Sequence, residues 1–146
     1  MYLIDTNVYI RAMRDEAFAL QLAEFEQASL PRLWVSAVVA FEIAVGSGDE
    51  QRARQVERRL LAPFRDRSRV LVPGARTWAA AARIDRAIRR MRGYADRLRD
   101  RAFLNDMLLA ASCREVGATL ITANGADFAL IDRAIGFRYL TRFPRP

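Results

Sequence analysis

The chain lacks two residue types altogether, and each absence excludes a group of chemistries. None of its 146 residues is histidine, which excludes Ser-His-Asp and Cys-His catalysis as well as histidine-ligated zinc. None is lysine either, which excludes P-loop nucleotide binding, Schiff-base chemistry and protein-kinase catalysis. The single cysteine, Cys113, excludes an internal disulfide and a cysteine-rich metal site. We interpret it as a small apolar residue on a buried helix face.

Long apolar segments are also missing. No run reaches 18 apolar residues, so we expect no membrane-spanning helix and no membrane partner. The first residues do not show the charged-then-apolar pattern of a secretion signal, and we therefore expect a cytoplasmic protein.

Arginine is what the chain has in excess. All 24 basic residues are arginine, against 17 acidic residues, and the net charge is +7. Such a balance favours a polyanionic partner, most often nucleic acid. The arginines gather in residues 50–69 and 83–101, where they suit either solvated helix faces or a track for phosphates.

Short apolar segments alternate with helical patterns along the chain, which predicts an α/β fold with a mainly parallel sheet. The expected strands are Tyr2–Ile4, Leu33–Val35, Val70–Val72, Ala118–Thr122 and Phe137–Leu140. The expected helices are Ala17–Ala28, Ala37–Gly46, Glu50–Phe64, Ala75–Arg92, Asn105–Val116 and Ala126–Ala134. No linker or repeat interrupts the pattern, so we expect a single domain over residues 1–146.

Four acidic residues stand alone in apolar surroundings. They are Asp5 in residues 1–10, Glu42 in 33–48, Asp106 in 102–113 and Asp127 in 116–131, each the only charge of its segment. Singly, each could be a capping or salt-bridging residue: Asp106 at the start of its helix, Asp127 at the turn before the last helix. Jointly, they lie in segments that flank strand ends, and parallel topology can bring all four to one rim of the sheet.

If these carboxylates converge, their repulsion is relieved either by protonation or by a hard divalent ion. Two of them about 5 Å apart at an effective dielectric near 20 repel by roughly 3 kcal/mol. An all-oxygen ligand set favours Mg²⁺ or Mn²⁺ over zinc. The chemistry that such a site supports is phosphodiester hydrolysis by metal-activated water, which needs no histidine and suits a basic protein that attracts a nucleic-acid backbone.

Four motifs, in this order, resemble the PIN domain, and most of all the toxin ribonucleases of the VapBC type. They are Leu3-Ile4-Asp5-Thr6-Asn7, Ser36–Glu42, Asn105–Ala111 and Leu120–Phe128, and together they span nearly the whole chain. The resemblance implies a three-layer α/β/α sandwich with a five-stranded parallel sheet. It also implies Mg²⁺- or Mn²⁺-dependent endoribonuclease activity as the toxin of a type II toxin–antitoxin system. The implied partners are an RNA substrate, a cognate antitoxin and a second copy of the chain.

Position by position, the resemblance implies four catalytic, metal-binding acids: Asp5, Glu42, Asp106 and Asp127. Supporting polar residues would be Thr6, Thr122 and Asn124. Asn124 and Asp127 both fit the fourth position of the family's motif, which leaves operation with one metal or with two open. Asn105 stands where many relatives have proline.

A nuclease has two alternatives. A catalytically silent RNA-binding or protein-interaction module on the same scaffold would be indifferent to metal, and the intact set of four acids argues against it. A phosphatase of the haloacid-dehalogenase type needs a second aspartate two residues after the first, but Asn7 occupies that position after Asp5.

Overall fold

A five-stranded sheet forms the centre of the protein, whose computed structural model describes residues 1–144. The strands are β1 (Tyr2–Ile4), β2 (Leu33–Ser36), β3 (Val70–Leu71), β4 (Thr119–Ile121) and β5 (Arg138–Leu140). All neighbours pair in parallel, in the order β3-β2-β1-β4-β5. The predicted parallel sheet is confirmed, with strand ends shifted by at most one residue. Of the domain expected over residues 1–146, the last two residues lie outside the described part.

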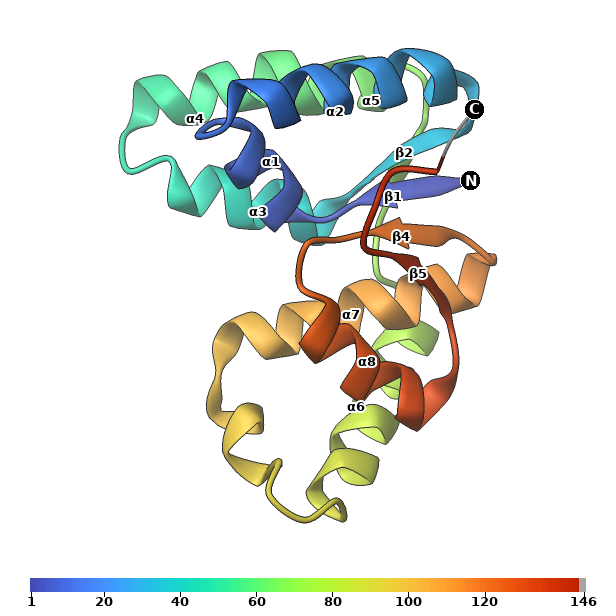
Figure 1. Ribbon diagram of the computed structural model, residues 1–146. Helices are drawn as coiled ribbons and strands as arrows, with labels where there is room; N and C mark the ends of the chain where they lie inside the picture. The colour runs from blue at the N-terminus through green and yellow to red at the C-terminus, as the bar shows by residue number, and fades with distance from the viewer. Residues whose placement is uncertain (145–146) are drawn as a thin grey trace.

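Helices cover both faces of the sheet, which gives the predicted α/β/α sandwich. The helices are α1 (Thr6–Ala12), α2 (Glu16–Ser29), α3 (Ala37–Gly46), α4 (Glu50–Val56), α5 (Ala62–Arg65), α6 (Ala75–Arg89), α7 (Arg101–Val116) and α8 (Gly125–Ile135). Figure 1 shows α1–α5 on one side of the sheet and α6–α8 on the other. Within residues 1–144, no helix is both long and apolar enough to cross a membrane.

Three differences from the predicted elements matter for the site. Helix α1 was not predicted, because its seven residues are too few to show a helical period. Helix α7 begins at Arg101 and not at Asn105, since Asp100 caps it by accepting a hydrogen bond from the Ala102 amide. A short 3₁₀ segment, η3 (Ala95–Arg99), leads into it.

The region predicted as one helix over Glu50–Phe64 changes its winding. Helix α4 passes into a π-helical turn, η2 (Glu57–Leu61), and continues as α5 to Arg65. Pro63 lies in the first turn of α5, where the missing amide hydrogen of proline is tolerated.

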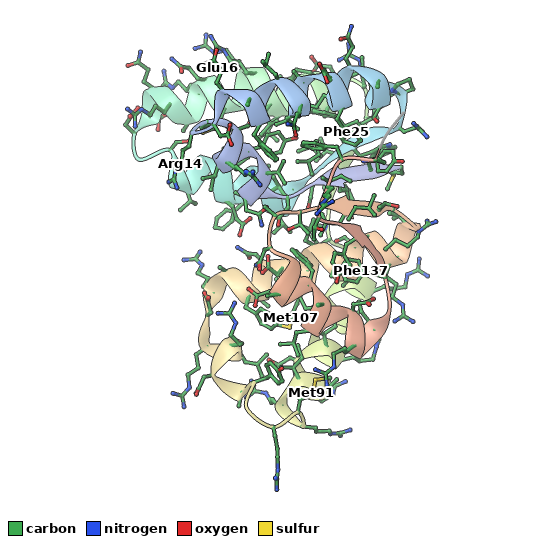
Figure 2. The ribbon with its side chains drawn as sticks, in the orientation of Figure 1. Arg14, Glu16, Phe25, Met91, Met107 and Phe137 are labelled. Carbon is green, nitrogen blue, oxygen red and sulfur yellow. The ribbon has the colours of Figure 1, made fainter. Side chains whose placement is uncertain are left out.

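The side chains of β1 and β4 alternate between two apolar cores, as expected for strands buried on both faces. Leu3 and its register partner Leu120 point into the larger core, which lies against α6–α8. Ile4 and Ile121, the next pair, point into a smaller core against α1 and α2. Figure 2 shows Phe25 on the side of the smaller core, with Met107 and Phe137 on the opposite side of the sheet.

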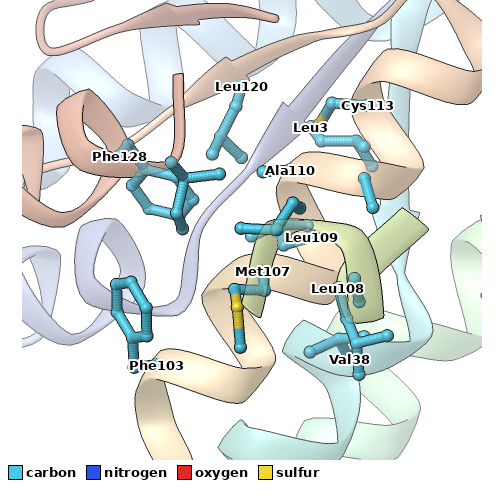
Figure 3. Packing of buried hydrophobic residues seen from close by; sticks show 14 of the residues in the cluster. Leu3, Val38, Phe103, Met107, Leu108, Leu109, Ala110, Cys113, Leu120 and Phe128 are labelled. Carbon is cyan, nitrogen blue, oxygen red and sulfur yellow. The ribbon is translucent and has the colours of Figure 1, made fainter. Parts of the chain in front are cut away.

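Helix α7 is buried along most of its length. Phe103, the run Met107–Ala111 and Cys113 are all at most 3% exposed. Figure 3 shows Phe103, Met107–Ala110 and Cys113 packed among Leu3, Leu120 and Phe128. Cys113 is therefore the buried apolar residue that the sequence predicts.

Candidate functional site

Asp5 and Thr122 meet because β1 and β4 end side by side. Ile4 and Ile121 are register partners, and the Asp5 amide donates to the Ile121 carbonyl at 2.9 Å. The next residue of each strand therefore faces the other: Thr122 Oγ1 donates to Asp5 Oδ2 at 2.7 Å. Asp5 is 2% exposed and Thr122 is 1% exposed. Strand order reverses between β1 and β4, which is where open α/β sheets place their ligand sites.

Asn7, in the first turn of α1, links Asp5 and Thr122 to the loop after β4 by hydrogen bonds. Its Nδ2 donates to Asp5 Oδ2 and, at 3.2 Å, to Thr122 Oγ1. Its Oδ1 accepts from the Ala123 amide at 2.8 Å. Asn7 belongs to the amino-terminal motif, but the sequence did not reveal this orienting role.

Asn124 connects Asp5's neighbour Thr122 to two more of the predicted acids. The Asn124 amide nitrogen donates to Thr122 Oγ1 at 2.9 Å. Its side-chain Nδ2 donates to Asp127 Oδ2 at 2.8 Å and to Asp106 Oδ2 at 3.4 Å. Asn124 is also the N-cap of α8 and accepts from the Asp127 amide, so the reading of Asp127 as the capping residue is wrong.

Glu42 is held by two neutral donors from other helices. Thr6 Oγ1, in α1, donates to Glu42 Oε2, and Asn105 Nδ2, in α7, donates to Glu42 Oε1 at 2.8 Å. Asn105 thus lies inside α7 and supplies a hydrogen-bond donor that proline lacks at this position. Asp106 follows it in the second turn of α7, so its expected place at the start of that helix is wrong.

The pKa values of two acids are raised. Burial raises the pKa of Asp5 to about 6, with a further increase from the charge of Glu42, against the hydrogen bond from Thr122 that lowers it. Burial raises the pKa of Asp106 to about 8, and the charges of Asp5, Asp127 and Glu42 raise it further, while Arg97 lowers it. The charges of Asp5, Glu42 and Asp127 therefore all reach Asp106.

The acids are not arranged as ligands of one ion in this conformation. Within residues 1–144, no three acidic side chains form a group that could hold a metal. Each carboxylate is instead turned to a donor of this chain, as described for Asp5, Glu42 and Asp106. The donor set is nonetheless of the type that Mg²⁺ and Mn²⁺ bind, with carboxylate, amide and hydroxyl oxygens and neither imidazole nor thiolate among them.

Asp127 has a cationic partner that the sequence did not single out. Arg97 of η3 forms an ion pair with Asp127 through Nη2, and its guanidinium carbon lies 5.6 Å from the ring centre of Phe103. Arg97 is one of eight arginines in residues 83–101, and nothing in the sequence distinguishes it from the others. Only the fold brings it to Asp127.

A cavity of about 530 Å³ opens beside Glu42. Its walls come from α1, α3, α4 and η2, and they include Thr6, Ile43 and Leu60. Two exposed arginines, Arg52 and Arg59, lie on its α4–η2 wall. Glu42 thus adjoins a cavity that is apolar within and positively charged on one side.

These features define an α/β protein with acidic residues at the switch point of a parallel sheet. The PIN domain family matches the chain over residues 2–134, and the chain therefore belongs to this family. PIN domains are generally nucleases. A comparison with curated protein sequences found no match.

Solved structures of toxin–antitoxin complexes share the fold. FitAcB from Neisseria gonorrhoeae aligns with a TM-score of 0.66 at 21% identity, covering 97% of both chains. VapBC-1 from nontypeable Haemophilus influenzae aligns with a TM-score of 0.64 at 23% identity, covering 95% of this chain and 96% of that one. VapBC2 from Rickettsia felis, bound to a DNA fragment from its promoter, aligns with a TM-score of 0.61 at 18% identity, covering 95% of this chain and 96% of that one.

Proposed function

We propose that this protein is a metal-dependent endoribonuclease that acts as the toxin of a type II toxin–antitoxin system. The observation that carries the proposal is a hydrogen-bond network at the carboxyl ends of β1 and β4. Thr122 and Asn124 link Asp5 to Asp106 and Asp127. Thr6, which follows Asp5, donates to Glu42. Burial and the charges of the neighbouring acids, which together raise the pKa of Asp106, favour an environment completed by a cation.

Mg²⁺, or Mn²⁺ in its place, is the proposed cofactor. Asp5, Glu42 and Asp106 would hold it as the core acids, and Asp127 is the acid at the fourth position of the family's motif. When bound, such an ion would lower the pKa of its water and stabilise charge on a phosphodiester. The family's general nuclease activity supports this assignment.

Neutral side chains orient the acids for this task. Thr122 and Asn7 both donate to Oδ2 of Asp5, which fixes the plane of that carboxylate. Thr6 and Asn105 bond one oxygen each of Glu42, so Glu42 exchanges one of these hydrogen bonds when it takes part in binding. Neutral donors permit this exchange at low cost, since they carry no charge that would repel a cation.

The arginines supply the attraction for RNA. With a net charge of +7, the chain draws a polyanion toward it, and Arg52 and Arg59 lie on the wall of the cavity beside Glu42. We propose that the backbone of the RNA follows this wall to the acids. Binding that depends on phosphate contacts weakens steeply as salt rises.

We further propose that a cognate antitoxin inhibits the protein, that two copies form a homodimer, and that the protein acts in the cytoplasm. Support comes from the fold shared with FitAcB and the two VapBC complexes.

The proposal is tested by RNA cleavage with purified protein. Cleavage is expected with Mg²⁺ or Mn²⁺ and is expected to stop with EDTA. Asp5→Asn and Glu42→Gln are expected to reduce the rate at least about 100-fold, because each removes charge from the site. The matched control is Asp96→Asn, since Asp96 lies on the surface and pairs with Arg99 there. Undiminished cleavage by both site variants would refute the assignment, provided that circular dichroism shows them folded.

The alternative is a catalytically silent RNA-binding or interaction module. It is favoured by one observation: within the described residues, no three acids are arranged to hold one ion. Such a module would bind RNA with the same salt dependence but with no response to metal or to Asp5→Asn. Fluorescence anisotropy with labelled RNA, read beside the cleavage assay, distinguishes the two.

A further inference from the structure

Asp127 differs from the other three acids in having a positively charged partner. Its Oδ2 forms an ion pair with Arg97 Nη2 and also accepts from Asn124 Nδ2 at 2.8 Å. Asp5 and Glu42, by contrast, accept hydrogen bonds from neutral threonine and asparagine side chains. The guanidinium of Arg97, a cation that belongs to the protein, therefore lies beside Asp127, the fourth acid.

The placement of Arg97 is more constrained than that of a surface arginine. The pairs Arg54–Glu50 in α4 and Arg89–Asp85 in α6 each join two residues that are four apart on the surface of a single helix. Arg97 instead reaches from η3 to α8 across 30 residues of sequence, to a carboxylate whose side chain is 15% exposed. Its guanidinium lies near the ring of Phe103, which is fully buried and so cannot move aside.

A guanidinium and a divalent ion cannot both neutralise one carboxylate at short range, because they repel each other in a partly desolvated pocket. An ion bound by Asp5, Glu42 and Asp106 meets this conflict less directly, since the side chains that donate to these acids are neutral and the charge of Arg97 reaches Asp106 without an ion pair. A second ion at Asp127 would have to displace Arg97 first.

We propose that Arg97 is a positioning residue that occupies the cation position at Asp127 and thereby restricts the centre to one divalent ion. The inference rests on the proposed metal-dependent function and deepens it. Asp127 then acts through its ion pair and not as a ligand of the bound ion.

The test counts Mn²⁺ ions per chain by isothermal titration calorimetry and looks for spin coupling between two Mn²⁺ ions by electron paramagnetic resonance. Wild type is expected to bind one ion without coupling. Arg97→Gln is expected to bind two coupled ions, and Arg97→Lys is expected to return to one, because lysine restores the charge. The double variant Arg97→Gln/Asp127→Asn is expected to bind one.

Arg99→Gln is the matched control. It removes an arginine from the same 3₁₀ segment, where Arg99 and its partner Asp96 are both exposed, and it is expected to leave one ion bound. In the wild-type background, Asp127→Asn is expected to change the affinity for the single ion less than threefold.

Two bound ions in wild type, or one in a folded Arg97→Gln, would overturn the inference. A tenfold loss of Mn²⁺ affinity in Asp127→Asn would overturn it as well, and this measurement decides the matter if Arg97→Gln does not fold. If the ion counts are as expected but the protein cuts no RNA, the inference stands and the proposed nuclease function is refuted. No Mn²⁺ binding by any variant would overturn both.

Discussion

Replacing Asp106 by asparagine is expected to stabilise the metal-free protein, and to do so more strongly as the pH rises. Burial and the neighbouring acids raise the pKa of Asp106 from 3.8 to about 8. Between these two values the folded protein keeps a proton that the unfolded chain has released, so stability falls with rising pH in this window. Below about pH 4 both states are protonated and the effect vanishes. Asparagine carries no charge in either state and removes the dependence.

The magnitude follows from the pKa difference. At about pH 7.5 the free-energy penalty has an upper limit of roughly 5 kcal/mol, at about 1.4 kcal/mol per pH unit above 3.8. Coupling to Asp5 and Glu42 reduces it, since a group of interacting acids shares its protons. If coupling leaves a third of the upper limit, the penalty that Asp106→Asn removes is about 2 kcal/mol. This corresponds to a rise in Tm of about 4–8 °C for a domain of this size.

The assay is thermal unfolding followed by circular dichroism in EDTA at about pH 5 and pH 7.5. Asp106→Asn is expected to raise Tm at both values and at least twice as much at the higher one. The control Asp96→Asn changes an exposed acid and is expected to shift Tm by about 1 °C or less at either pH. An unchanged or lower Tm for Asp106→Asn at about pH 7.5 would refute the electrostatic reasoning.

Three further predictions concern metal, backbone and core. Saturating Mn²⁺ at about 100 times its Kd is expected to stabilise wild type by about 2.7 kcal/mol in thermal melts, and an equal response of Asp106→Asn would contradict the site. Gly117 ends α7 with φ at 69°, so Gly117→Ala is expected to cost about 1 kcal/mol in urea unfolding, whereas Gly46→Ala, in a helix with open space around it, is expected to cost nothing. Phe128 is fully buried, and Phe128→Ala is expected to cost about 3–5 kcal/mol in the same assay; a loss below about 1 kcal/mol would show that its surroundings collapse into the space.

The strands and the longer helices were predictable because their signals are local. Tyr2–Ile4 and Ala37–Gly46 were placed to the residue, since an apolar segment and a capping serine mark their ends. The start of α7 was misplaced by four residues, because Asp100 follows a run of arginines in which no apolar period is visible. Helix α1 was not predictable in this way, because seven residues are too few to show a helical period.

The sequence alone determined the α/β class and marked the four acids as exceptional, because both follow from patterns within a few residues of each position. It could not determine the partners of those acids. Thr122 reaches Asp5 across 117 positions, Asn105 reaches Glu42 across 63, and Arg97 reaches Asp127 across 30. Such pairings depend on strand register and helix packing, so only the tertiary structure decided which acids face neutral donors and which one faces an arginine.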